Sequence, residues 1–455
     1  MSLKIFCEDI MKKYIDAIEK NRKLILDTQD YVWKNAETGW REYKTSHYME
    51  NVFESLGYNL VKGENVPGFY TVIDTGREGP EILILGELDS LICREHPDAN
   101  PETGAVHCCG HSAQCAALVG IAAALREKDL LSTLSGRIRL CAVPAEELIE
   151  IDYRKSLMEK GIISHMGGKT EFLSRGYFDG VDIAFMIHTS TGNSFMIQTS
   201  RDVGCIAKKI TYKGKSAHAG GCPWDGINAL YAATQGLSAI NALRETFREQ
   251  DCIRVHPIIT KGGSAVNAIP DEVTIESYVR GASFDAIKEA NDQVNRALCG
   301  AALSMGANIE IEDIPGYAPL IQDKTLAEAA EKVFHKIMPS SPLTIKTETG
   351  TASTDMGDLS CVFPSLHFYA PGAVGTSHGK DYFINDKEAS CVQSAIWQLS
   401  LAAYLLENNA AKAHKVLNSF SPLFKSGKEY IEFLNTLSSS GERIEYLDKK
   451  ACVKL

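Results

Sequence analysis

Residues 81–89 read Glu-Ile-Leu-Ile-Leu-Gly-Glu-Leu-Asp, and this stretch decides the fold class. The run from Ile82 to Leu85 is entirely apolar, which is typical of a strand covered on both faces, as in a parallel sheet flanked by helices. Strands that alternate with helices predict a largely parallel α/β sheet. The other elements predicted on this basis are strands at 69–74, 137–143, 181–187 and 366–369, and an alanine- and leucine-rich helix at 112–126.

A second domain is predicted within the chain, because 455 residues are too many for one compact core. Its elements follow the β-α-β-β-α-β order of a ferredoxin-like domain. We therefore predict a first domain formed by residues 1–202 and 319–455, with residues 203–318 inserted and a helical tail from Asn408. The inserted elements are strands at 205–213, 253–260, 272–280 and 308–314, and helices at 225–243 and 284–303.

The charge balance excludes several kinds of partner. The chain has 47 basic and 58 acidic residues, a net charge of −11, whereas nucleic acids and anionic membranes attract basic surfaces. The 13 cysteines are an odd number in a long chain, which favours reduced thiols over a disulfide scaffold. No leader pattern opens the chain, and no apolar run reaches the about 18 residues of a membrane span. We expect a cytoplasmic protein that acts on small molecules and binds neither nucleic acid nor membrane.

Polar side chains gather where four predicted strands end. Ligands of open α/β sheets bind outside the carboxyl ends of the strands, so these side chains are expected to converge. A fifth group, His-Cys-Cys-Gly-His, directly precedes the alanine-rich helix. The residues concerned are Glu87 and Asp89, Glu146 and Glu147, His188, His378, and the cluster from His107 to His111.

Each of these signals has an ordinary structural explanation. A lone histidine such as His188 is more often a structural residue, and Glu146 with Glu147 would suit the first turn of a helix. Cys109-Gly110-His111 could be a buried thiol beside a capping histidine. The coincidence of all five groups favours a metal site instead, because thiolate, imidazole and carboxylate suit zinc, or manganese where oxygen donors are added. A carboxylate that is not a ligand can take a proton from an attacking water.

The motifs, taken in order, resemble family twenty of the metallopeptidases, which includes carboxypeptidase G and aminoacylase. The matching segments are Gly-Glu-Leu-Asp at 86–89, His-Cys-Cys-Gly-His at 107–111, Pro-Ala-Glu-Glu at 144–147, and in the second domain 214–219 and 262–271. The segment 353–358 is similar to the aminobenzoyl-glutamate hydrolase branch, which is related to the hydrolases of indole-acetyl-amino acids. The resemblance implies an aminopeptidase-like catalytic domain that binds two metals, with an inserted lid and dimerisation domain.

The resemblance also implies a role for each matching residue. Glu146 matches the general base, and Asp89 matches the acid that orients a metal ligand. His218 matches a histidine that reaches the site across a dimer and stabilises the oxyanion, while Asn267 and Arg280 match residues that hold the substrate. The implied metal ligands are Cys109, which bridges the two metals, with His111, Glu147, His188 and His378.

Three features depart from the family pattern without removing a ligand. Ser112 follows the Cys-Gly-His triplet, where relatives often have Asp or Asn, and Glu87 replaces the usual first Asp of an acidic pair. The loop between Asp89 and His107 is long and carries Cys93, His96 and Asp98. These departures affect substrate preference and positioning rather than hydrolysis.

The sequence predicts a metal-dependent amidohydrolase or peptidase, with two zinc or manganese ions, that forms a homodimer through the lid domain. Its substrate would be an N-acyl or aminoacyl amino acid. The alternative is a catalytically silent family member that only binds metal or ligand, but such a protein would be expected to lose Glu146 or a ligand. A nucleotide-dependent dehydrogenase is excluded because no Gly-x-Gly-x-x-Gly follows the first strands.

Overall fold

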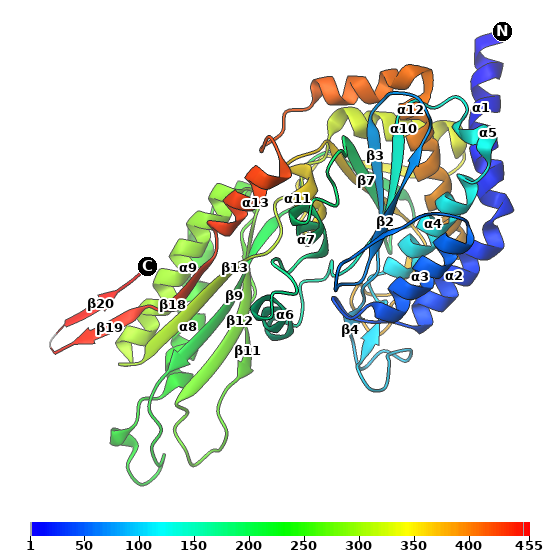
Figure 1. The fold of residues 1–455 in the computed structure, drawn as a ribbon. Helices are drawn as coiled ribbons and strands as arrows, with labels where there is room; N and C mark the ends of the chain where they lie inside the picture. The colour runs from blue at the N-terminus through cyan, green and yellow to red at the C-terminus, as the bar shows by residue number, and fades with distance from the viewer. Residues whose placement is uncertain (1, 449) are drawn as a thin grey trace. The chain divides into compact units, whose positions relative to one another are not determined.

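The computed structural model describes residues 2–448 and 450–455, and the chain divides into two compact units (Figure 1). The first unit contains the residues up to Ser200 together with Ile321–Glu348 and Asp358–Gly427. The second unit contains Arg201–Leu320, Thr349–Gly357 and Lys428–Leu455. Each unit has its own sheet and its own core, as expected for a chain of this length.

The first unit is built on an eight-stranded sheet whose central strands are parallel. β3 lies between β6 and β7, and β15 follows β7, with all of these pairs parallel. The predicted α/β fold class, with a mostly parallel sheet in a two-domain chain, is therefore confirmed. In sheet order the strands are β1 (Val61–Lys62), β2 (Phe69–Asp74), β6 (Arg137–Val143), β3 (Glu81–Glu87), β7 (Ile183–Thr189), β15 (Ser365–Ala370), β8 (Phe195–Gln198) and β14 (Leu343–Lys346).

The helices of the first unit cover this sheet because their apolar faces need a partner. α4 is buried along its whole length, which agrees with its alanine-rich, uniformly apolar sequence. Its Gly120 permits a close approach to α2, since a Cβ there would lie 2.5 Å from Ile25. The helices are α1 (Ser2–Lys20), α2 (Arg22–Lys34), α3 (Tyr43–Ser55), α4 (His111–Ala124), α5 (Lys128–Leu131), α6 (Ile151–Glu159), α7 (Gly168–Ser174), α10 (Lys324–Ile337) and α12 (Ser394–Ser419), with α11 (Met356–Ser360) at a change between units.

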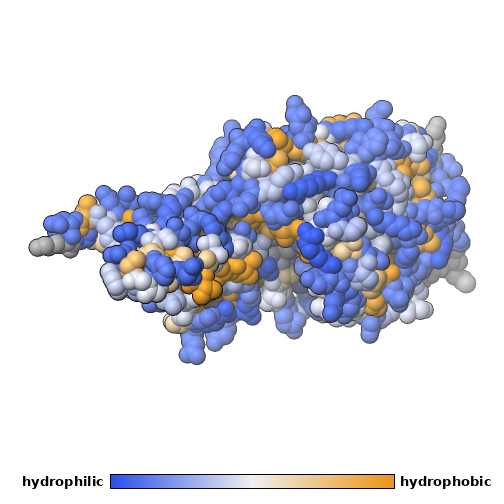
Figure 2. Space-filling model, turned by 90° about the horizontal axis from the view of Figure 1, so that it is seen from below, coloured by the Kyte–Doolittle hydropathy of each residue, from blue (hydrophilic) through white to orange (hydrophobic). Residues whose placement is uncertain are grey.

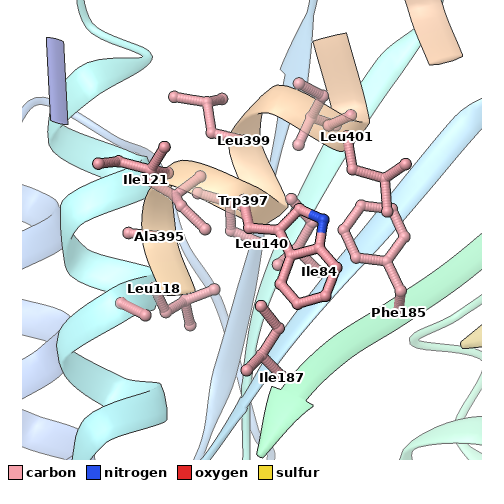
Figure 3. Packing of buried hydrophobic residues seen from close by; sticks show 14 of the residues in the cluster. Ile84, Leu118, Ile121, Leu140, Phe185, Ile187, Ala395, Trp397, Leu399 and Leu401 are labelled. Atoms are coloured by element: carbon pink, nitrogen blue, oxygen red, sulfur yellow. The ribbon is translucent and has the colours of Figure 1, made fainter. Parts of the chain in front are cut away.

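Trp397 on α12 is the centre of the core of this unit (Figure 3). Its ring packs edge-on against Phe368 of β15 and against Phe195 of β8. Its indole N–H is not left unpaired, because it donates to the carbonyl of Ala330 on α10. Trp397 thus packs α12 and α10 against the sheet. The ends of the strands of this sheet carry the polar residues singled out in the sequence.

One helical stretch among the described residues, Glu388–Ser419, is long and apolar enough to cross a membrane. It is buried inside the fold over 89% of its apolar window, so it is explained as a core helix. Its regular geometry is interrupted between Glu407 and Ala410. On the face seen in Figure 2, hydrophilic residues predominate and the hydrophobic ones form small groups between them.

The second unit has an antiparallel sheet of the order β10-β12-β9-β13-β18, with β11 also paired to β12. Two helices, α8 and α9, pack on it through a core that includes Tyr212, Ile275 and Leu298. The element order from β9 to β13 is the predicted ferredoxin-like one, except that the strand expected at 253–260 is divided into β10 and β11. The bounds are β9 (Gly204–Lys213), α8 (Ala229–Leu243), β10 (Arg254–Val255), β11 (Ile258–Lys261), β12 (Glu272–Gly281), α9 (Phe284–Ser304), β13 (Asn308–Pro315), α13 (Gly427–Asn435), β18 (Ser439–Glu442), β19 (Ile444–Leu447) and β20 (Lys450–Val453).

The C-terminal tail corrects the sequence prediction. Residues 319–455 were expected to complete the first domain and to end as helices. Instead, Lys428–Leu455 belong to the second unit, where β18 pairs antiparallel with β13 and extends its sheet. The tail is helical as expected in the end of α12 and in α13, but after α13 the free edge of β13 offers backbone partners, and the chain becomes a strand there. Thr349–Gly357 also belong to the second unit.

Candidate metal centre

Six predicted site residues of the first unit come together at the carboxyl ends of the parallel strands. In the described part of the chain these six residues form three groups whose ligand atoms lie within 4.8 Å of one another: Cys109 with His111 and His188, Cys109 with Glu147 and His378, and His111 with Glu146 and Glu147. Glu146 and Glu147 follow β6, His188 lies near the end of β7, His378 follows β15, and Cys109 and His111 stand at the start of α4. The first two groups share the thiol of Cys109, and we call them the His188 triad and the His378 triad.

Both histidines of the His188 triad, the buried His111 and the partly buried His188, present the same ring nitrogen to the site. Nδ1 of His111 lies 2.9 Å from the carbonyl oxygen of Asp89, and Nδ1 of His188 lies 2.8 Å from that of Thr189. Carbonyl oxygens only accept, so each Nδ1 carries a proton, and Nε2 is the atom of each ring that can bind a metal once it holds no proton. Nε2 of His188 lies 3.3 Å from the sulfur of Cys109. Burial, together with the nearby charge of His111, lowers the pKa of His188 to about 4, which keeps it neutral.

Gly110 makes the tight turn that places Cys109 and His111 side by side. Its φ is 92°, in the region that favours glycine, and it precedes the first residue of α4. A Cβ at this position would also lie 2.4 Å from the hydroxyl of Tyr382. Burial raises the pKa of the Cys109 thiol well above its usual range, so metal binding must displace a proton from it.

Asp89 connects two ligand segments through one carboxylate. Its Oδ1 lies 3.2 Å from Nδ1 of His111, and its Oδ2 accepts the backbone N–H of Glu147 at 2.8 Å. Burial alone would raise its pKa, but the hydrogen bond and charge of His111 outweigh burial, so the pKa of Asp89 is lowered. Asp89 thus contacts both the ring of His111 and the backbone of Glu147.

Beneath His111 lies a buried ion pair that sequence reasoning did not single out. The ammonium of Lys169 is 2.5 Å from Oε1 of Glu87, and neither side chain reaches solvent. Oε2 of Glu87 accepts from the amide of Gln114 and lies 3.3 Å from Nε2 of His111. Burial raises the pKa of Glu87, but Lys169 and His111 overcome this and hold its pKa well below its ordinary value. Glu87 is therefore a carboxylate that faces the metal centre.

The loop that carries Glu146 and Glu147 is held in a strained conformation. Ala145 has a φ of 55°, which is uncommon for a residue with a Cβ, and such conformations persist only when the surroundings enforce them. Its backbone N–H donates to Oε1 of Glu42 at 2.7 Å. The buried guanidinium of Arg154 donates to the carbonyl of Glu147. Glu42 lies 103 residues before Ala145 and Arg154 only seven residues after Glu147, and no local pattern marked either residue.

Burial and the neighbouring charge of Asp89 raise the pKa of Glu42 well above its ordinary value. The raised pKa favours the neutral form of the Glu42 carboxyl, which limits the negative charge beside Asp89 while Oε1 holds Ala145. Its other oxygen, Oε2, has no hydrogen-bond partner among the described residues.

His378 approaches from a hairpin formed by β16 (Ala373–Val374) and β17 (Phe383–Ile384). Its Nε2 lies 3.4 Å from Oε1 of Glu147, and its backbone N–H donates to the carbonyl of Cys108 at 2.9 Å. The side chain remains half exposed, unlike those of His111 and His188. Its exposure makes this triad the more open part of the centre.

The three remaining predicted residues lie in the second unit. His218 and Asn267 are neighbours there, because His218 forms a β-bridge with Ala268 and the N–H of Ala219 donates to the carbonyl of Asn267. Nδ1 of His218 accepts from the N–H groups of Gly220 and Gly221, so its Nε2 carries the proton in the neutral ring. Arg280 lies near the opposite end of β12, opposite Cys205 of β9.

The residues of the first unit fit a divalent metal. Nε2 of His111 and Oε1 of Glu147 are buried and have no hydrogen-bond partner among the described residues, which is costly unless something else satisfies them. Both atoms belong to the ligand groups described above. Their surroundings supply thiol, imidazole and carboxylate donors, the set that zinc and manganese sites draw on.

Comparison with known proteins identifies the family. Residues 83–401 match the family described as peptidase family M20/M25/M40. The chain belongs to this family. The match spans the ligand-bearing segments and the inserted unit, so the resemblance inferred from the motifs is confirmed.

Individual relatives agree with this assignment. The chain is 30% identical over 294 residues to a mouse Xaa-Arg dipeptidase, which covers 63% of this chain and 62% of that protein. It is 25% identical to a thermostable carboxypeptidase 2 of Saccharolobus solfataricus, over 88% of this chain and 98% of the relative. One of the two polypeptides of the Escherichia coli p-aminobenzoyl-glutamate hydrolase is 26% identical over 71% of this chain and 64% of its own length. The last relative represents the branch that the sequence resemblance named.

The fold has a counterpart among solved structures. A Bacillus subtilis protein described as a dinuclear metal-binding peptidase of family M20 superposes with a TM-score of 0.63 at 19% identity. The superposition covers 85% of this chain and 99% of that one. The comparisons as a whole support an amide-bond hydrolase of this family and do not favour the catalytically silent alternative.

Proposed function

We propose that this protein is a metal-dependent amidohydrolase that removes an amino acid from an N-acyl or aminoacyl conjugate. The observation that carries the proposal is the pair of triads that share Cys109, with Glu146 beside them. One shared thiolate with a ligand set on either side is an arrangement suited to two metals held close together, which is the two-metal form of hydrolytic catalysis. The Bacillus subtilis fold relative is itself described as dinuclear.

In this proposal Glu146 is the general base. Its ligand atom lies within 4.8 Å of those of His111 and Glu147, so it is close to the metal ligands without belonging to either triad. Bound divalent metals supply Lewis acidity at this position. Glu146 takes the proton of the attacking water and returns it to the leaving amine. Asp89 acts earlier, by fixing the ring of His111 and the backbone of Glu147.

The second unit supplies the substrate contacts. His218 is exposed, and its Nε2 proton is available because Nδ1 is occupied by two backbone N–H groups. Such a donor suits the oxyanion of the tetrahedral intermediate. Asn267 and Arg280 offer an amide and a guanidinium for the substrate's carbonyl and carboxylate, and Arg280 is suited to bidentate contact.

The geometry of the second unit supports a homodimer. His218 and Asn267 lie beside the start of β12 at Glu272, whereas Arg280 lies eight residues further along the same strand. At the rise of an extended strand this corresponds to roughly 26 Å, longer than an aminoacyl amino acid. His218 and Arg280 of one copy therefore do not meet on one substrate molecule. We propose that each site takes His218 and Asn267 from the partner subunit.

The metals proposed are zinc or manganese. Cys109 and the imidazoles favour zinc, while Glu147 and additional water oxygens would also accept manganese. We also propose that the protein works in the cytoplasm. In support, the 12 cysteines outside the first ten residues are all free thiols, and seven of them are buried as packing residues.

The relatives suggest which conjugates to test. One relative is named for dipeptides that end in arginine, and another for p-aminobenzoyl-glutamate. Both kinds of compound have an amide bond followed by a free α-carboxylate. We propose substrates of that class. The assay described next determines which side chain the released amino acid carries.

The deciding experiment is hydrolysis of a small panel by protein reconstituted with zinc or manganese. The panel would contain p-aminobenzoyl-glutamate, an indole-acetyl-amino acid, an N-acetyl amino acid and a dipeptide ending in arginine. Release of an amino acid that stops on chelation, and that Glu146→Gln lowers by about 10²–10⁴-fold while metal content is kept, would support the proposal. Glu159→Gln, a surface change on α6, serves as the matched control. Metal binding without cleavage of any panel member would contradict it.

A further inference from the structure

The long loop between Asp89 and His107 folds into a defined hairpin. β4 (Leu91–Ile92) pairs antiparallel with β5 (Ala105–Val106), and the chain then enters the Cys109 turn. We call residues 91–106 the β4–β5 hairpin. Within it His96 is only 3% exposed, which is unusual for a polar residue in a loop. A buried imidazole in a connecting segment requires partners, and both of its nitrogens have them.

The hydrogen bonds of His96 fix its proton and its direction. Its Nδ1 accepts the backbone N–H of Asp98 at 3.0 Å, so in the neutral ring the proton is on Nε2. Nε2 lies 2.8 Å from the carbonyl oxygen of Tyr382, which can only accept. His96 therefore donates one hydrogen bond to a residue 286 positions away. That bond joins the β4–β5 hairpin to the chain just before β17.

Aromatic contacts support the same connection. The imidazole of His96 packs against the ring of Phe383, with 4.8 Å between the centroids. Trp33 of α2 lies against both rings, at 6.1 Å from each, and its indole N–H donates to Asp98. The ring of His96 thus packs against both Trp33 and Phe383. Its two nitrogens bond to the backbone of Asp98 and of Tyr382.

The segment that His96 contacts, the hairpin of β16 and β17, also carries His378. The hairpin of β16 and β17 brackets His378, and Tyr382 stands four residues after it. His378 itself has a φ of 64°, a left-handed conformation that a residue with a Cβ adopts only when its surroundings enforce it. At the other end of the hairpin, Tyr382 is buried and its hydroxyl reaches the turn at Gly110.

Among the described residues, two hydrogen bonds join this hairpin to the β4–β5 hairpin and the Cys109 segment, beside an apolar cluster that includes Val106, Cys108, Tyr382 and Ile384. One is the N–H of His378 on the carbonyl of Cys108, and the other is the bond from His96 to Tyr382. Only the second comes from a side chain, so it is the one that a substitution can remove selectively. Without it, the Cys108 contact, the β16–β17 pairing and the apolar cluster would have to hold His378 in its strained conformation.

We infer that His96 is a positioning residue for His378, and that it keeps the His378 triad assembled for the second metal. The inference rests on the proposed metal-dependent function. It adds a residue that touches neither metal nor substrate and acts through the carbonyl of Tyr382. Contacts that orient a metal ligand in this way typically change metal affinity by roughly 10–100-fold.

The test uses Co²⁺ as a probe of the full-length protein. Apo-protein is titrated with Co²⁺, and the two binding steps are followed by the thiolate-to-cobalt absorption and by equilibrium dialysis. The variants are His96→Phe, which keeps a ring of similar size without donors, and His96→Gln, whose amide N–H takes the place of Nε2. His335→Phe on α10, an exposed histidine, is the matched control.

For His96→Phe we expect one binding step to remain as in the wild type and the other to weaken by roughly 10–100-fold. His96→Gln should recover part of the lost affinity, because it can still donate to Tyr382. His335→Phe should leave both steps unchanged. The melting temperature of each apo-variant is measured alongside, so that loss of folding is recognised.

Three results would overturn the inference. In the first, His96→Phe binds two Co²⁺ ions like the wild type. In the second, both steps weaken equally, the apo-protein melts lower and His96→Gln gives no recovery, which is a purely structural role. In the third, the wild type binds no Co²⁺; this outcome also removes the proposed function, whereas the first two leave it standing.

Discussion

The carboxylate of Asp89 lies against the imidazole of His111, with 3.2 Å between Oδ1 and Nδ1. Both side chains are fully buried, so the contact is made in a region of low dielectric where it is strong. The same carboxylate also accepts the N–H of Glu147. One side chain thus sets the direction of a ligand from α4 and the backbone of a ligand from the loop after β6.

The first prediction concerns this double role. Asp89→Asn retains one accepting oxygen but presents an N–H group at the other position, which cannot accept from His111 and Glu147 together. We expect metal affinity to fall by about 10–100-fold. Competition with a chromogenic chelator measures it. Asp74→Asn, at the exposed end of β2, is the control, and equal affinities for the two variants would refute the role of Asp89.

The second prediction concerns the ion pair of Lys169 and Glu87. Lys169→Met leaves the carboxylate of Glu87 buried without its counter-charge, and the unfolding free energy should fall by about 3–5 kcal/mol. The double variant with Glu87→Gln removes the unpaired charge and should regain much of the loss. Urea unfolding followed by tryptophan fluorescence measures both, since the buried Trp40 and Trp397 lie in the first unit. A double variant that is as unstable as the single one would show that charge is not the cause.

The third prediction is a dependence of stability on pH in the second unit. Buried Asp313 is within hydrogen-bond distance of Lys208, Asn291 and Asn295, and the N–H of Asn291 donates to it at 3.0 Å. Burial raises the pKa of Asp313, but Lys208 and the hydrogen bonds outweigh burial and lower it. Its folded pKa is therefore below the unfolded value of about 3.9. The stability it contributes is present above that value and is lost as pH falls through the folded pKa.

Other groups also face this pair. Ser439 donates to Asp313 from β18, and Arg443 donates to Ser439 in turn. Asp313→Asn should lower the melting temperature at pH 7, with the difference from wild type shrinking as the pH falls below about 4. Differential scanning calorimetry across that range checks it. A difference that does not change with pH would mean that the charge of Asp313 does not stabilise the unit.

The fourth prediction tests the shared site. His218→Ala and Glu146→Gln should each be nearly inactive as homodimers. In a randomly mixed dimer population, half the dimers contain both variants, and one of their two sites has both native residues. The mixture should therefore recover about a quarter of wild-type activity after subunit exchange. No recovery, with exchange verified by mass spectrometry of labelled subunits, would place His218 in the same chain as its Glu146.

The parts of the fold that were predictable are those with a local pattern. The apolar run at Ile82–Leu85 and the alanine-rich helix after Gly110 have periodicities that hardly any other structure satisfies, and the parallel arrangement then brings their ends together. The cluster of Cys109, His111, Glu146, Glu147, His188 and His378 followed from that reasoning and from the motifs.

The residues that sequence reasoning missed act singly and over long distances. Lys169, Glu42 and Arg154 each come from a segment with no chemical motif, and their role exists only because folding buries a charge or a carbonyl beside them. A lysine in the first turn of a helix is ordinarily a surface residue. The tail was misassigned for a similar reason, since pairing along β13 depends on an edge that the local sequence does not reveal.

The pairing of β18 with β13 has a practical consequence for handling the protein. It puts the C-terminal segment at one border of the second sheet, while β10 lies at the opposite border. An affinity tag or fluorophore attached after Leu455 would thus be remote from the border occupied by β10 and β11, and subunit-exchange assays can use C-terminally labelled protein. Ending the chain before Ser439 to aid crystallisation would remove β18. The backbone N–H and C=O groups of β13 would then be unpaired, and this exposed edge could pair with other molecules.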